Sequence, residues 1–149
     1  MRHWIVKDMP VTPPTLVDIE AARLRISAHA RLTPVLRDEA LDAEIGARLY
    51  FKCENLQKIG AFKARGAVNA VFSLPADVAG HGVVTHSSGN HGAALAYAAR
   101  RRGIPAWVVM PENAPKVKIA NVAREGATIR FCVATVAARE AACAEVQGE

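Results

Sequence analysis

The fold is decided by residues 83–110, which read VVTHSSGNHGAALAYAARRRGIPAWVVM. Short apolar runs at residues 83–85 and 106–110 are typical of buried strands. The alanine-rich segment between them, residues 90–102, predicts a helix that ends at Gly103, since glycine readily adopts the left-handed conformation that closes a helix. A strand, a helix and a second strand in this order predict parallel strands joined by a right-handed crossover.

The same alternation continues to the end of the sequence. Pro115 is suited to open a helix that runs to about Arg124, and residues 128–133 and 135–146 predict a third strand and a third helix. We therefore expect residues 81–149 to form a small α/β domain, a three-layer sandwich around a parallel sheet, and we expect it to be truncated.

The first 80 residues predict a second structural unit, separated from the first by the Pro75 and Gly80–Gly82 region. Residues 1–14 contain three prolines and predict an irregular arm. Thr15 is a suitable N-cap for a helix. The predicted regular elements of this unit are helices at residues 15–30, 38–45 and 61–73, and strands at residues 35–36 and 49–54.

Composition excludes several classes of protein. The chain has 149 residues, 51% of them hydrophobic, which suits one ordinary folded domain. No apolar run reaches the roughly 20 residues that span a bilayer, and no secretory signal is visible, so we expect a cytoplasmic protein. The net charge is +5, but only 5% of the residues are aromatic, which argues against nucleic-acid binding. The three cysteines are widely spaced and predict no zinc or redox pair.

Lys63 is the first candidate functional residue. It precedes Ala67, Val71 and Leu74 by four, eight and eleven residues, so on a helix it shares their apolar stripe. Removing an ammonium from water favours the neutral, nucleophilic amine, and a helix N-terminus acts in the same direction. The alternative is a lysine that snorkels along apolar surface and keeps its charge in water.

The loop at residues 86–92, which reads HSSGNHG, is the second candidate. It joins a predicted strand to a predicted helix, the place where parallel sheets bind ligands. Hydroxyl groups, an amide and glycine-permitted backbone approach suit a carboxylate or a phosphate. The alternative is an ordinary turn in which Ser88 or Asn90 caps the helix.

The residues in and before this loop argue against three other kinds of site: a nucleophile elbow, a dinucleotide-binding loop and a metal site. Thr85 stands where a nucleophile elbow requires glycine, and the loop lacks the first glycine pair of a dinucleotide-binding motif. The histidines at positions 81, 86 and 91 share no common face and have no nearby carboxylate, so we predict no metal site.

Three motifs carry a family resemblance: KCENLQKIGAFKARGA at residues 52–67, THSSGNHGAALAYAA at residues 85–99 and RGIPAWVVMPENAPKVK at residues 102–118. With them the chain resembles the pyridoxal-phosphate-dependent serine/threonine dehydratases and serine racemases, whose fold is called type II or tryptophan-synthase-β-like. The resemblance implies that residues 1–80 are the N-terminal segment of the large domain, with the cofactor lysine, and that residues 81–149 are most of the small domain.

The resemblance also implies site residues. Lys63 would form the Schiff base with pyridoxal 5'-phosphate and would later act as the base at Cα of the substrate. Phe62 would lie against the cofactor, and Asn90 would hydrogen-bond its ring hydroxyl. Ser88 matches the residue that in the racemases acts on the opposite face of Cα. Three further loop residues would help hold the substrate carboxylate: Ser87, Gly89 and His91.

The implied activity is the β-elimination of L-threonine or L-serine to a 2-oxo acid and ammonia, by an ammonia-lyase that forms homo-oligomers. A serine racemase is the alternative within the family. The third alternative is a truncated, catalytically inactive fragment or assembly piece, because the family's phosphate loop and its divalent-cation ligands come later in the chain. The motifs also depart from the family pattern at Ile59, Ala61 and Ala93. For the isolated chain we expect no turnover.

Overall fold

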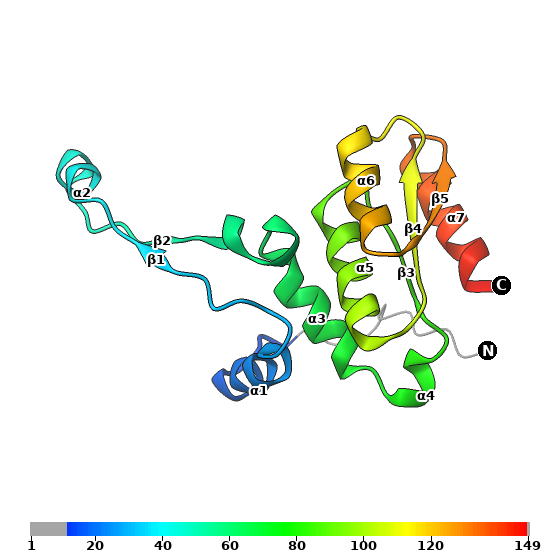
Figure 1. Ribbon diagram of the computed structural model, residues 1–149, viewed down its shortest axis with the longest axis horizontal. Helices are drawn as coiled ribbons and strands as arrows, with labels where there is room; N and C mark the ends of the chain where they lie inside the picture. Colours follow the sequence, from blue (N-terminus) through cyan, green and yellow to red (C-terminus); the bar gives the residue numbers. More distant parts are fainter. Residues whose placement is uncertain (1–11, 149) are drawn as a thin grey trace.

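The computed structural model describes residues 12–148. A parallel sheet of three strands in the order β3-β4-β5 forms its centre. The strands are β3 (Val83–His86), β4 (Ala106–Pro111) and β5 (Thr128–Cys132). Helices α5 (Asn90–Arg102) and α6 (Lys116–Arg124) cover one face, and α7 (Val136–Gly148) covers the other (Figure 1). The predicted three-layer sandwich with a parallel sheet is confirmed.

Helix α5 is the most deeply packed element. All eight residues from Gly92 to Ala99 are buried. A Cβ at Gly92 would lie 2.9 Å from a methyl group of Val108, so only glycine lets the helix approach β4 this closely. The helix ends at Gly103 in the left-handed conformation, at φ 73°, as its sequence predicts.

Helix α3 (Lys63–Ser73) packs along α5. The side of α3 that meets α5 is Ala64, Ala67, Val68 and Val71, all buried. Lys63 is exposed and lies outside this stripe. Ala67 and Val71 of the predicted stripe are buried as expected, but Lys63 itself is exposed, so the expectation of a buried lysine is wrong.

Residues 12–62, before α3, are called the arm below, and residues 63–148 are called the body. Residues 16–26 of the arm contact α3 and residues 58–60 contact α5, whereas residues 35–52 extend away from the body (Figure 1). The arm contains α1 (Leu16–Ile26), β1 (Val35–Leu36), α2 (Glu39–Ile45), β2 (Phe51–Lys52) and two 3₁₀ turns, Glu54–Leu56 and Lys58–Gly60. The two strands pair antiparallel. No residue of α1, β1, α2 or β2 is buried.

The structure departs from the predicted elements at three places, two in the arm and one in the body. The first helix ends at Ile26, not at Ala30, although Thr15 caps it as expected. The predicted strand at residues 49–54 is reduced to Phe51–Lys52, because only these residues have a partner in β1. The short helix α4 (Ala76–Ala79) was not predicted. The irregular arm predicted for residues 1–14 lies almost entirely outside the described residues.

No helix among residues 12–148 is long and apolar enough to cross a membrane.

Candidate active site

Three helices on one side of the sheet begin near its carboxyl end, and α7 begins at the same end on the other side. Helices α5 and α6 follow directly from β3 and β4, so their first residues lie at that edge. Helix α3 runs beside α5 in the same direction, which brings its first residue, Lys63, toward the same end (Figure 1).

These three helix starts differ from those of the arm. Helices α3, α5 and α6 have no side-chain cap and no acidic residue in the first turn. Helix α1 has a capping box between Thr15 and Asp18, and α2 is capped by Asp38. Uncapped N–H groups and the positive end of the helix dipole both attract anions. The site is therefore suited to a phosphate or a carboxylate.

Two hydrogen bonds of Ser87 hold the loop after β3. The N–H of Ser87 donates to the carbonyl oxygen of Val109 at 3.0 Å, which continues the pairing of the parallel strands. The Ser87 hydroxyl in turn accepts a bond from the N–H of Gly89 at 3.2 Å. Gly89 is the N-cap of α5, so the alternative in which Ser88 or Asn90 caps this helix is wrong.

Lys63 presents a free amine to this end of the molecule. Its side chain is exposed, and its ammonium forms no hydrogen bond or ion pair with the residues that the structure describes. The nitrogen lies 5.3 Å from the centre of the Phe62 ring. Burial lowers the pKa of His91, and the positive charge of Lys63 lowers it further.

Asn90 is connected to the next crossover. Its side-chain oxygen accepts a hydrogen bond from Lys118 Nζ at 3.1 Å. Lys118 was not predicted as a site residue. Because it follows Asn90 by 28 residues, its proximity depends on the packing of α6 beside α5.

The turn that precedes Lys63 has an unusual backbone. Ile59 has φ 57° and ψ 10°, and Gly60 has φ 70°. A β-branched residue in the left-handed region is strained by roughly 1–3 kcal/mol. Ile59 packs against the apolar cluster between α3 and α5, and this burial holds it in place.

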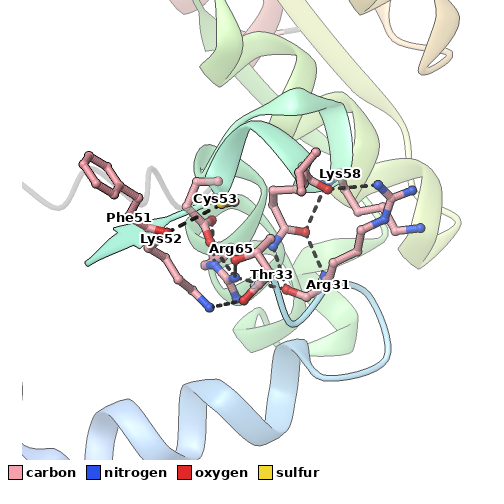
Figure 2. Close-up of polar contacts among 10 residues, drawn as sticks. Arg31, Thr33, Phe51, Lys52, Cys53, Lys58 and Arg65 are labelled. Carbon is pink, nitrogen blue, oxygen red and sulfur yellow. Dashed lines mark hydrogen bonds and ion pairs between the residues drawn. The ribbon is translucent and has the colours of Figure 1, made fainter. Parts of the chain in front are cut away.

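An ion pair connects the 3₁₀ turn Glu54–Leu56 to α3 (Figure 2). Arg65 donates from Nε and Nη2 to the two carboxylate oxygens of Glu54, each at 2.8 Å. The Thr33 hydroxyl donates to the same carboxylate at 2.6 Å. These hydrogen bonds, that of Arg65 foremost, lower the pKa of Glu54 from 4.5 to about 2.

Gln57, between the two 3₁₀ turns, connects them to Arg31 earlier in the arm. Its amide is 2% exposed, accepts from the N–H of Arg31 and donates to the carbonyl oxygen of Arg31, both at 2.8 Å. The Gln57 side-chain oxygen also accepts a hydrogen bond from the N–H of Lys58 at 2.9 Å. These bonds, with those of Glu54, fix the position at which α3 and Lys63 begin. The sequence interpretation missed both residues, although they lie in the KCENLQKIGAFKARGA motif.

Among residues 12–148 there is no group of three histidine, cysteine or acidic residues that could hold a metal ion.

Comparisons with known proteins identify the family. A family model described as "Pyridoxal-phosphate dependent enzyme" matches residues 26–149. The chain is 51% identical to a serine racemase of Dictyostelium discoideum over 131 residues, 88% of this chain and 40% of that protein. It is 51% identical to a β-hydroxyaspartate dehydratase of Paracoccus denitrificans (strain Pd 1222) over 136 residues, 91% of this chain and 43% of that protein.

The solved structure of maize serine racemase matches with a TM-score of 0.85 and 48% identity, over 87% of this chain and 40% of that one. The fold is thus that of the type II pyridoxal-phosphate enzymes. The chain belongs to the family of pyridoxal-phosphate-dependent enzymes, whose cofactor is pyridoxal 5'-phosphate. It spans about 40% of the length of these relatives. The predicted family, fold and cofactor are confirmed.

The residues present fit this cofactor. The exposed Lys63 amine forms no hydrogen bond or ion pair among the described residues and is available for a covalent bond to the cofactor aldehyde. Nearby helix starts without acidic residues suit its anionic groups. Phe62 is exposed beside Lys63, where its ring could lie against the cofactor.

Proposed function

We propose that the protein removes the α-proton of L-threonine or L-serine and eliminates the β-hydroxyl, which releases a 2-oxo acid and ammonia. The observation that carries this proposal is the free Lys63 amine at the end of the sheet where three uncapped helices begin. The dehydratase from Paracoccus, similar over 91% of this chain, supports it.

Each residue has a proposed task. Lys63 holds the cofactor covalently and then acts as the base at Cα. Asn90 donates to the ring oxygen. The bound cofactor supplies an electron sink for the charge that develops at Cα. Three loop residues bind the substrate carboxylate: Ser87, Gly89 and His91. His91 suits a carboxylate because it is the second residue of α5, whose uncapped start attracts anions.

Serine racemisation is the second candidate. Ser88 follows β3 in the same loop, is half-buried, and forms no hydrogen bond among the described residues, so its hydroxyl is available as an acid on the face of Cα opposite Lys63. The serine racemases of Dictyostelium and maize, each about half identical to this chain, favour this alternative.

The two activities are separated by products. Because the isolated chain is expected not to turn over, the whole enzyme that includes it is purified with pyridoxal phosphate. Release of 2-oxo acid from L-threonine and formation of D-serine from L-serine are then measured for the natural sequence, Lys63→Ala and Ser88→Ala. Lys63→Ala is expected to abolish both. Loss of D-serine alone in Ser88→Ala supports racemisation as an activity of this site. If 2-oxo acid release continues undiminished in Lys63→Ala, the proposal is wrong.

Three further properties are proposals. We propose that residues 1–80 belong to the large domain of the whole enzyme and residues 81–149 to the small domain. We propose a homo-oligomer, since apolar side chains of the arm such as Leu32, which is 95% exposed, favour association. A cytoplasmic location is proposed from the resemblance to soluble amino-acid enzymes.

A further inference from the structure

The contact between Lys118 and Asn90 has a definite direction. Lys118 Nζ lies 3.1 Å from Asn90 Oδ1. An ammonium group has three donors and no acceptor, so it can meet only the oxygen of an amide. This removes the usual ambiguity between the oxygen and nitrogen of an asparagine side chain. The Asn90 NH₂ group must then point away from Lys118.

The freed NH₂ group has no other partner. No residue in the described part of the chain accepts a hydrogen bond from the Asn90 amide nitrogen. Asn90 is exposed as the first residue of α5, whereas Lys118 is half-buried in the first turn of α6. An exposed amide alone can rotate by half a turn and offer its oxygen in place of its nitrogen. Lys118 removes this freedom.

The position of Lys118 is electrostatically unfavourable by itself. It lies in the first turn of α6 and beside the first residue of α5, and the positive end of each helix dipole repels a cation. Neither first turn contains an acidic residue. An anion at this end of the sheet would offset the repulsion.

We propose that Lys118 is a positioning residue that orients the Asn90 amide so that its N–H group donates to an oxygen anion of the bound cofactor. The inference rests on the proposed function, because it assumes that Asn90 faces the cofactor. It adds a residue of the second crossover to the site and assigns its effect to Asn90, not to direct contact with the ligand.

The first test is a double-mutant cycle on cofactor binding. Affinity for pyridoxal phosphate is measured by absorbance titration for Lys118→Met, Asn90→Ala and the double variant. Loss of one hydrogen bond predicts a fall of about 5- to 10-fold for Lys118→Met. The double variant should bind no more weakly than Asn90→Ala. If the two losses multiply, or if Lys118→Met binds normally, the proposal is overturned.

The second test needs no cofactor. The side-chain NH₂ resonances of Asn90 are followed by NMR in the cofactor-free protein. Lys118→Met should shift and broaden them as the amide begins to rotate, and Lys118→Arg, which restores a donor, should reverse part of the change. Lys116→Met is the matched control, since Lys116 lies in the same turn, is exposed and has no partner among the described residues. Unchanged Asn90 resonances in Lys118→Met would contradict the proposal.

A failure of the proposed function can be told apart from a failure of the proposed role of Lys118. If Lys63→Ala binds the cofactor as well as the natural sequence, the proposed function fails whatever Lys118 does. If Lys63 is required and Lys118→Met has no effect, the proposed function stands and only the role of Lys118 is rejected.

Discussion

The arm and the body are held together by different interactions. In the body, buried apolar side chains such as Val108 and Met110 fill the space between the sheet and its helices. In the described part of the arm only Thr33, Gln57 and Ala61 are buried, and two of these three are polar. The body is therefore stabilised by packing, whereas the arm is held mainly by a small set of hydrogen bonds close to Lys63, with Ile26 and Ile59 packed against the core of the body.

The arm positions Lys63, and the body positions Asn90. The hydrogen bonds that fix the arm converge on the turn before Lys63, and the packing of the body fixes the loop that contains Asn90. The two halves of the candidate site thus depend on different forces. Conditions that weaken hydrogen bonds and ion pairs should displace Lys63 before they disturb Asn90.

Core substitution should give the largest difference between the regions. Met110→Ala removes a side chain that is 0% exposed and should lower the free energy of unfolding by about 2–5 kcal/mol. Leu36→Ala, at a residue of the arm that is 56% exposed, should change it by less than about 0.5 kcal/mol. Urea unfolding measures both. Equal losses would mean that the arm has a core of its own.

Gln57→Ala should loosen the arm specifically. The substitution leaves the N–H groups of Arg31 and Lys58 without their acceptor, at a cost of about 2–3 kcal/mol. Hydrogen exchange of these two amides should accelerate, while that of α5 stays unchanged. Gln147→Ala is the control, since Gln147 is exposed on α7. Equal acceleration in α5 would show that arm and body unfold together.

Acid should weaken the contact between the arm and α3. The folded-state pKa of Glu54 is about 2, below its ordinary 4.5, so the stabilisation is complete above about pH 4.5 and is lost as the pH falls toward 2. The loss should be about 1–3 kcal/mol in urea unfolding at stepped pH. Glu54→Gln should flatten this part of the profile, while Glu44→Gln, at an exposed position of α2, should leave it as it is. An unchanged slope in Glu54→Gln would refute the ion pair.

The cap of α1 should have the smallest effect. Thr15 accepts from the N–H of Asp18, and Thr15→Ala should destabilise the first turn by about 1 kcal/mol. Faster hydrogen exchange confined to α1 is the expected result, with Thr12→Ala as the control. A change that spreads into α3 would show that α1 is coupled to the body more strongly than its exposure indicates.

Local sequence signals predicted the body well. Gly103 and Pro115 mark helix boundaries by their own backbone preferences, and short apolar runs mark the strands, so the order of elements could be obtained without tertiary information. The spacing correctly aligned Ala67 and Val71 on a buried face of α3, but it could not show that Lys63, at the first position of the helix, is exposed.

The remaining features depend on contacts between distant residues. Glu54 meets Thr33 across 21 residues, and Gln57 meets Arg31 across 26, so neither pair has a local sequence signal. Lys118 reaches Asn90 only because α6 packs beside α5. The residue types of the candidate site could be recognised from the motifs, but the residues that position them could not.

The most direct test of the central claim is to locate the covalent bond between cofactor and protein. The protein is incubated with one equivalent of pyridoxal phosphate, reduced with borohydride and digested, and the label is located by mass spectrometry. We predict that the label is concentrated on Lys63 and that total labelling falls sharply in Lys63→Ala. Label spread evenly over Lys58, Lys63 and Lys116, with no fall in Lys63→Ala, would contradict the assignment of Lys63 as the cofactor lysine.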